Sequence, residues 1–327
     1  MQLSDRIGRR IKLHDLHVLM AVVQTGSMGK AAALLNTTQS AVSRSIAELE
    51  QTIGVRLLDR HAQGVELTHY GRALLKRGTV AFDELKQGVQ DIEFLANPGT
   101  GELFIGSSSA VSEGIVLTVI DKLFHQYPRA TFHLLPIGLP TLYDELRERR
   151  IDLGFARIDE PALKPDDVHQ EPLFDDQLIV VASSDNPWTR RRKIRLAELL
   201  NEPWTWPTAG TTLDKLIVQA FRANGLEAPR PTVYAADINA RLRLAATGRF
   251  LAVVPANNLR FFTKHESIKM LPVEFSTSYR RIGIITLKNR TLSPLAQLFI
   301  KCAHETAKPF ARARHGHSVR RPLSKVS

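Results

Sequence analysis

Apolar residues near the start of the chain recur with the period of an α-helix. Their spacing predicts a helix over 13–25, a short helix over 28–35 and a third helix within 36–53. Breaks between these helices are expected at Gly26–Ser27 and at Asn36–Thr37. The apolar stripe of the third predicted helix consists of Val42, Ile46, Leu49 and Ile53. Three short helices in succession are therefore expected to open the chain.

The opposite face of the third helix carries short polar side chains, whereas a solvated helix face usually carries Glu, Lys and Arg. Thr38 is placed to cap this helix, because its hydroxyl can accept a hydrogen bond from a first-turn N–H group. Gln39 can read an adenine edge or contact a phosphate, and Arg44 can bind guanine O6 and N7 or hold a phosphate. Ser40 and Ser43 are small enough to let the helix approach a surface closely.

This order of helices is typical of a helix-turn-helix, here over about 28–47, whose second helix enters the DNA major groove. Two short apolar runs flank residues 61–64 and predict a hairpin-like wing. Arg60 in this wing is placed to reach a backbone phosphate or the minor groove. We therefore predict a winged DNA-binding domain over residues 1–68. The pattern alone also fits a small helical bundle with a featureless exposed face.

Residues 69–96 are predicted to form one long helix, which Asn97–Gly99 ends. Its apolar positions keep a spacing near 3.5 and are Leu74, Leu75, Gly78, Ala81, Phe82, Leu85, Val89, Ile92, Phe94 and Leu95. A helix of this length extends about 42 Å and needs a partner along its apolar side. The partner can be a second subunit or the rest of the same chain, and we assign 69–98 as a linker and dimerisation helix.

Residues 101–305 alternate between strand-like and helix-like patterns. Predicted strands lie within 102–107, 130–136, 151–156, 177–183, 231–235 and 250–255, and predicted helices end at Tyr127 or lie over 140–149, 212–224 and 238–247. This alternation predicts an α/β domain with open parallel sheets and helices on both faces. In such sheets ligands bind beyond the carboxyl ends of the strands.

The formal net charge of +11 is unevenly distributed along the 327 residues. Residues 1–68 carry only +2, whereas the segment 306–327 carries +6 and no acidic residue. We expect this segment to be a disordered basic tail, either simply solvated or acting as a nucleic-acid arm. The net charge permits DNA binding without establishing it.

Composition points to an intracellular location. The single cysteine, Cys302, excludes a disulfide framework and fits a reducing cytosol. No apolar stretch reaches the length of a membrane span. Basic residues precede the apolar run 16–23 and imitate a signal peptide, but this run is short and contains His17. We expect a soluble, cytoplasmic protein.

The segment from Gly26 to Gly71 closely resembles the N-terminal DNA-binding domain of LysR-type transcriptional regulators. The resemblance rests on the run GSMGKAAALLNTTQSAVSRSIAELEQTIGVRLLDR followed by LTHYG. The chain has Thr38 for a serine of the family pattern, Ser40 for a proline and Leu58 for a phenylalanine. The fold class implied is a multidomain α+β protein: a winged helix-turn-helix, a linker helix that pairs with that of a second subunit, and a C-terminal effector domain.

The resemblance also implies the form of that effector domain. It should consist of two α/β subdomains like a type 2 periplasmic binding protein, with crossovers near Phe174–Asp175 and Thr277. Subdomain I would comprise 101–174 and 277–305, and subdomain II would comprise 175–276. An effector in the cleft between them would alter the geometry of the DNA-binding pairs.

Strand ends indicate which residues line this cleft. The first strand runs into Ser107, Ser108 and Ser109, whose hydroxyl and N–H groups suit a carboxylate or a polyol. Gly138 ends the second strand, and Arg157 ends the third, where its guanidinium can pair with an anion. Comparable positions in the second subdomain are Pro207, Thr208, Asp237, Asn239 and Pro255. Each of these residues can instead be a structural turn residue.

Two other classes of protein need consideration. Gly106 to Ala110 resembles a nucleophile elbow around Ser108, but a hydrolase also needs an acid and a histidine within reach. His265 and His304 exist, yet no arrangement with Ser108 is indicated. A free solute-binding protein is disfavoured by the DNA-binding unit, and Cys302 with His304 lacks the other ligands of a metal site.

We therefore expect a non-enzymatic transcription regulator without a metal or other cofactor. Its predicted partners are double-stranded operator DNA, a small organic anion or a sugar, further copies of itself as a homodimer or homotetramer, and RNA polymerase. Within the family, the resemblance leans toward regulators of sugar or aromatic catabolism, including the galactose-binding-protein regulator group.

Overall fold

The computed structural model describes residues 7–8, 10–61, 64–97, 99–158, 164–261, 267–273 and 280–311. The chain divides into two compact units, Met1–Val89 and Gln90–Ser327. The boundary between them falls inside the long helix α4 (His69–Ala96). Among the described residues, no helix has the length and apolar character needed to span a membrane.

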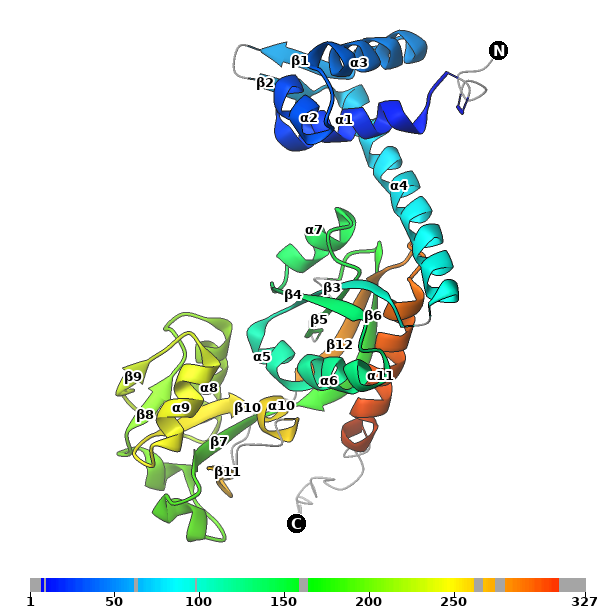
Figure 1. The fold of residues 1–327 in the computed structure, drawn as a ribbon. Coiled ribbons are helices and arrows are strands. Elements are labelled where there is room, and N and C mark those ends of the chain that lie inside the picture. The colour runs from blue at the N-terminus through cyan, green and yellow to red at the C-terminus, as the bar shows by residue number, and fades with distance from the viewer. Residues whose placement is uncertain are drawn as a thin grey trace, which may run out of the picture. The chain divides into compact units, whose positions relative to one another are not determined.

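The N-terminal unit has the predicted helix order followed by a two-stranded wing (Figure 1). Its elements before α4 are α1 (Leu13–Thr25), α2 (Met28–Leu34), α3 (Gln39–Ile53), β1 (Leu58–His61) and β2 (Gly64–Leu67). The strands β1 and β2 pair antiparallel. The apolar stripes of the three helices meet in one core, in which Leu19, Ile46 and Leu49 are fully buried. The predicted periodicity is thus confirmed for all three helices.

Local chemistry fixes where these helices begin and end. Thr38 caps α3 as predicted, because its Oγ1 accepts from the backbone N of Ala41 at 3.2 Å. Gly54 ends α3 with φ of 90°, a left-handed conformation that favours glycine. Gly26 ends α1 in the same way, with φ of 67°. These caps set the short turns of the helix-turn-helix.

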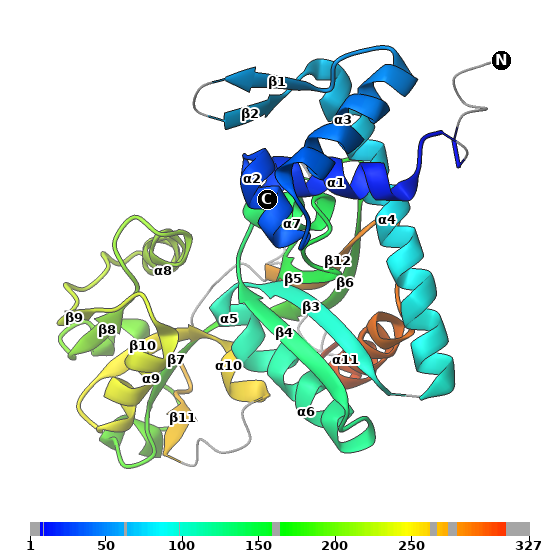
Figure 2. The ribbon, with the colours of Figure 1, turned by 45° about the horizontal axis from the view of Figure 1, so that its top comes forward.

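The C-terminal unit contains two five-stranded sheets (Figures 1 and 2). The first has the order β4-β3-β5-β12-β6, and the second has the order β11-β7-β10-β8-β9. Strands of the first sheet are β3 (Gly101–Ser107), β4 (Ala130–Pro136), β5 (Leu153–Arg157), β6 (Val168–Asp176) and β12 (Arg280–Leu287). Strands of the second sheet are β7 (Leu178–Ser183), β8 (Trp204–Trp206), β9 (Val233–Tyr234), β10 (Leu251–Pro255) and β11 (Ile268–Met270).

The sheets were predicted to be open and parallel, but both are mixed. β12 runs antiparallel to both β5 and β6, and β7 runs antiparallel to β10 and β11. The remaining strands pair in parallel, as expected for strands joined through helices. The antiparallel strands lie where the chain enters or returns from the second sheet, so their direction follows from the crossovers rather than from strand–helix alternation.

Helices cover both faces of each sheet, as predicted. Those of the first subdomain are α5 (Ser109–Val111), α6 (Leu117–Gln126), α7 (Thr141–Arg147) and α11 (Pro294–Ala311), with a π-helical turn over Ser112–Val116. Those of the second are α8 (Thr212–Ala223) and α9 (Ile238–Ala246), and α10 (Ala256–Arg260) follows β10. Separate apolar clusters fill the two faces of each sheet.

The division into subdomains differs from the prediction in two places. The first crossover lies at Gln177, between β6 and β7, close to the expected position. After β10, Phe261 packs into the core of the first subdomain, although the predicted second subdomain extends to residue 276. The second predicted crossover, at Thr277, lies outside the described residues. Helix α11 continues to Ala311, past the predicted domain end at 305, and the rest of the basic tail lies outside the described residues.

Candidate functional site

The exposed face of α3 contains the residues that its periodicity predicts. Thr38, Gln39, Ser40 and Arg44 are exposed, and Ser43 is half-buried. No acidic side chain lies in the first turn of the helix. This end of α3 therefore presents hydroxyl, amide and guanidinium groups.

The wing and α3 meet at this face. Arg60 on β1 is exposed, and its Nη1 donates to Ser43 Oγ over 3.4 Å. Thr38 Oγ1 and Ser40 Oγ lie 3.0 Å apart and share a hydrogen bond. The structure thus brings all six predicted DNA-contacting residues onto one surface.

Two acidic side chains hold α3 in place from its buried side. The Asp15 carboxylate on α1 accepts from Ser45 Oγ at 2.9 Å and from the backbone N of Lys12 at 3.3 Å. At the other end, Glu50 Oε1 accepts from the backbone N of Leu57 at 2.7 Å and of Leu58 at 3.1 Å. The second contact fixes the start of the wing relative to α3. These four hydrogen bonds fix α3 from its buried side and leave its polar face exposed.

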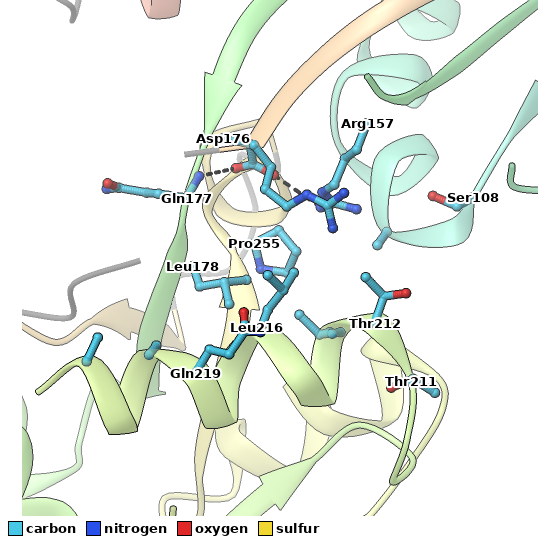
Figure 3. Close-up of a pocket in the computed structure, with 15 residues that line it drawn as sticks. Ser108, Arg157, Asp176, Gln177, Leu178, Thr211, Thr212, Leu216, Gln219 and Pro255 are labelled. Atoms are coloured by element: carbon cyan, nitrogen blue, oxygen red, sulfur yellow. Dashed lines mark hydrogen bonds and ion pairs between the residues drawn. The ribbon is translucent and has the colours of Figure 1, made fainter. Parts of the chain in front are cut away.

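The C-terminal unit contains a cavity of about 450 Å³ between its two subdomains. Side chains from β5, β6 and the start of β12 form one wall, and helix α8 forms the opposite one. The lining comprises Ser108, Ala110, Arg157, Asp176, Gln177, Leu178, Thr211, Thr212, Leu213, Leu216, Gln219, Ala220, Ala223, Pro255 and Arg280. Figure 3 shows Arg157 and Asp176 facing α8, with Leu178 and Pro255 between them.

An ion pair dominates the charged wall. Arg157 Nη2 donates to Asp176 Oδ2 at 3.3 Å, and the Asp176 side chain is only 2% exposed. Asp176 Oδ1 also accepts from the backbone N of Asn257 at 2.9 Å and of Gln177 at 3.1 Å. Burial raises the pKa of Asp176, and Arg157 opposes that rise. The carboxylate therefore depends on these donors for its charge.

Of the predicted cleft residues, Ser108, Arg157 and Pro255 line this cavity. Ser107 is fully buried, and its Oγ donates to the backbone O of Ser108 at 3.3 Å. Ser109 is the first residue of α5 and is exposed outside the lining. The other predicted residues outside the lining are Gly138, Pro207, Thr208, Asp237 and Asn239.

Three of the residues outside the lining have structural contacts instead. Asp237 caps α9, accepting from the backbone N of Asn239 at 3.1 Å. Asn239 Nδ2 donates to Glu113 Oε1 at 2.8 Å and so joins the two subdomains. Thr208 O accepts from Thr211 Oγ1 at 2.7 Å, one turn before α8 begins. The pKa of Glu113 is raised, mainly by burial and also by the negative charge of Asp237.

A buried asparagine makes a second junction between the subdomains. Asn257 Oδ1 accepts from the backbone N of Ile115 at 3.2 Å, and its Nδ2 donates to the backbone O of Ala110 at 2.9 Å. A Cβ at Gly114 would collide with this side chain, so glycine is required there. Arg241 on α9 is also buried, and this burial lowers its pKa to about 10.

Sequence reasoning missed the α8 wall of the cavity. Leu213, Leu216, Ala220 and Ala223 recur at helical spacing and all line it. The same pattern is ordinarily a core stripe, and α8 has another buried face with Ile217 and Phe221. The sequence signal that could have identified this wall is the presence of two apolar faces on one predicted helix.

Models of known families match both parts of the chain. Residues 13–72 match the "Bacterial regulatory helix-turn-helix protein, lysR family", and residues 96–308 match the "LysR substrate binding domain". Among solved structures, a full-length OxyR variant from Pseudomonas aeruginosa aligns with a TM-score of 0.63 at 19% identity, covering 92% of this chain and 98% of that one. Full-length CbnR complexed with its target DNA aligns with a TM-score of 0.51 at 21% identity, covering 91% and 100%. At these identities the two structures show the fold alone.

Curated relatives agree over nearly the whole length. The regulator YdcI of Escherichia coli K12 is 25% identical, covering 94% of this chain and 99% of that protein, and its function is uncharacterized. TdcA of the same strain is 27% identical, covering 90% and 93%. GbpR of Azospirillum brasilense is 26% identical, covering 96% and 90%, so the predicted galactose-binding-protein subgroup is not singled out. The chain therefore belongs to the LysR family and is a DNA-binding transcriptional regulator with a C-terminal effector-binding domain.

Proposed function

We propose that this regulator reads operator DNA through α3 and the wing and that a small organic molecule in the cavity of the C-terminal unit controls its response. The observation that carries the proposal is the composition of that cavity, whose lining comes from both subdomains. A ligand that touches both subdomains favours one relative arrangement of them over others. The bound ligand would thereby change the geometry that the assembled subunits of the regulator impose on DNA.

The polar face of α3 supports the DNA-contacting role of Thr38, Gln39, Ser40, Ser43 and Arg44. Short hydroxyl side chains allow the helix to lie deep in the major groove, where an arginine can bind a guanine edge in a bidentate manner. Arg60 lies beside this face and is suited to a phosphate.

An exposed stripe on α4 supports self-association. Leu85, Val89, Ile92 and Leu95 are 50%, 54%, 67% and 79% exposed, and they follow one another at helical spacing. Leucine and isoleucine repeats of this kind are buried when two helices pair. We propose that α4 pairs with α4 of a second copy to form a homodimer, which can assemble further into a tetramer.

The proposed function includes no reaction. The elbow-like Ser108 would need a histidine partner, but His304 is instead 3.0 Å from Glu171, and His265 lies outside the described residues. The curated relatives are named as transcriptional regulators. A DNA-binding regulator acts where the chromosome is, so we place the protein in the cytoplasm.

Replacing Ser108 tests the cavity as the effector site. The Ser108→Leu variant fills part of the lining, whereas Ser109→Leu adds the same side chain at the neighbouring exposed position outside it. A thermal-shift screen of organic acids and sugars should find ligands that stabilise the wild type and Ser109→Leu but not Ser108→Leu. A footprint on operator DNA should then change with ligand in the first two proteins alone. Ligand responses that survive in Ser108→Leu would place the effector elsewhere.

A further inference from the structure

The cavity of the C-terminal unit has two walls of opposite character. The wall from the first subdomain and the crossover carries Arg157, Asp176 and Arg280, so the charged groups of the lining sum to +1. The α8 wall carries Leu213, Leu216, Ala220 and Ala223, and Leu178 and Pro255 extend its apolar surface. Figure 3 shows this opposition, with the Arg157 guanidinium facing the side of α8 from which Leu216 projects.

The apolar wall is long. From Leu213 to Ala223 the helix axis advances about 15 Å at 1.5 Å per residue. Among the residues of α8 that line the cavity, only Thr212 and Gln219 carry hydrogen-bonding side chains. A ligand lying along α8 therefore meets mostly methyl and methylene groups.

We propose that the effector is an amphipathic monocarboxylate, an inference that rests on the proposed effector site. Its carboxylate faces Arg157 and Arg280, and its alkyl or aryl body lies along α8. One negative charge matches the net charge of the lining, and the apolar body gains free energy by leaving water for the leucine wall. No covalent step is involved.

The same walls disfavour a sugar, which the sequence leaves open, and a doubly charged organic anion. A sugar would place hydroxyl groups against Leu213 and Leu216, where they lose their hydrogen bonds to water without replacement. A dicarboxylate would set its second charge against the same apolar surface, at a large desolvation cost. Both classes therefore bind more weakly than a monocarboxylate of similar size.

A homologous series of ligands tests this assignment on the full-length protein. Butanoate, hexanoate and octanoate should bind with affinities that rise about fourfold for each added methylene. Hexanol and hexylamine lack the negative charge, hexanedioate has one charge too many, and galactose lacks the apolar body. Each should bind at least tenfold more weakly than hexanoate in isothermal titration calorimetry.

Variants on two faces of α8 show where the series binds. Leu216→Gln places an amide on the apolar wall and should abolish the gain per methylene. Ala223→Gln, at an exposed position of the same wall, should reduce the gain for octanoate more than for butanoate. Lys215→Gln, on α8 outside the lining, should leave the series unchanged.

The outcomes separate the ligand class from the site. If galactose or hexanedioate binds best and Ser108→Leu blocks it, the class is wrong and the cavity remains the effector site. If monocarboxylates bind to Leu216→Gln and to Ser108→Leu as tightly as to the wild type, they bind outside this cavity, and the assignment of a monocarboxylate to this site is wrong. Absence of any monocarboxylate binding, or an affinity independent of chain length, overturns the class.

Discussion

Helix α3 in the N-terminal unit and helix α8 in the C-terminal unit begin alike and present opposite chemistry to their partners. Each starts at a threonine N-cap: Thr38 Oγ1 accepts from Ala41 N at 3.2 Å, and Thr211 Oγ1 accepts from Asp214 N at 3.3 Å. Each buries one apolar stripe in the core of its own unit. A second face is polar on α3 and carries Arg44, whereas on α8 the second face is largely apolar and lines a cavity.

Under the proposed function, the core-facing stripe of each helix stabilises the fold, and the second face determines which partner the helix binds. A polyanion such as DNA is held by groups that keep their hydrogen bonds to water until contact, so the α3 face can be fully exposed. A small ligand needs an enclosed surface from which water is easily displaced, and α8 offers this under the charged wall.

The largest effect on stability is expected from substitutions in the buried apolar stripe that each of the two helices has. Ile46 on α3 and Ile217 on α8 are both fully buried. Ile46→Ala and Ile217→Ala should each lower the free energy of unfolding by about 2–5 kcal/mol, because each leaves a cavity in its core. Urea denaturation followed by circular dichroism measures this, with the exposed Gln51→Ala as a control within about 0.5 kcal/mol of wild type. A neutral Ile46→Ala would mean that α3 is not anchored by its apolar stripe.

The next largest effect is a loss of operator binding, expected from a substitution on the polar face of α3 and not from one on α8 or α9. Arg44→Ala should weaken operator binding by about 1–3 kcal/mol, as expected for an arginine at a base edge, without changing the free energy of unfolding. Gel retardation on operator and on random DNA measures the difference. Arg243→Ala removes the same charge from an exposed position on α9 and serves as the control. Equal losses on the two DNAs would show that Arg44 only holds phosphate.

A smaller effect tests the feature that the helices have in common. Thr38→Ala and Thr211→Ala should each cost about 1 kcal/mol by removing the oxygen that accepts from a first-turn N–H group. Hydrogen exchange should show the loss in the amides of the altered helix and leave the other helix unchanged. Faster exchange in α3 after Thr211→Ala would contradict the independence of the two cores.

The α3 surface could be predicted from sequence because its residues are nearly contiguous. Thr38, Gln39, Ser40, Ser43 and Arg44 occupy one face of one helix, and a period of 3.6 residues is enough to place them together. Arg60 was added from the wing pattern, and its bond to Ser43 confirms that it reaches this face.

The cavity could be predicted only where it depends on strand ends. Ser108 follows β3, and Arg157 is the last residue of β5. These strands are parallel and their carboxyl ends lie side by side, so strand order brings the two residues together. Asp176 and Arg280 lie on β6 and β12, and Gln177 directly follows β6. The antiparallel pairing of these two strands is not encoded in an apolar run. Their place in the lining needs the tertiary fold.

The other predicted cleft residues lie outside the lining for a local reason. Pro207 and Thr208 end a strand as expected, but a further turn separates them from α8, and the lining resumes only at Thr211. Asp237 and Asn239 lie at a helix start, where capping and the bond to Glu113 occupy their polar groups. A strand end identifies the neighbourhood of a cleft without deciding which side chain enters it.

The smallest effect is expected from deleting the basic C-terminal residues, which distinguishes their charge from the specific contacts of α3. Residues 312–327 contain five basic side chains and no acidic one. If they add only non-specific attraction to DNA, deleting them should reduce the salt dependence of binding. The slope of log K against log salt should fall by at most about 0.9 for each phosphate that the segment neutralises. The ratio of operator affinity to random-DNA affinity should stay within twofold of wild type.

The position of this deletion matters, because helix α11 extends to Ala311. A cut at 306 would remove Phe310, whose ring centroid lies 4.8 Å from that of Phe261 and 6.2 Å from that of Phe174. It would also remove Ala307 from the same core. A protein that ends at Ala311 keeps this packing, so altered DNA binding can be attributed to the missing charge. Loss of operator preference in this protein, with its circular dichroism unchanged, would show that the basic segment contributes to sequence recognition and that α3 and the wing are not sufficient for it.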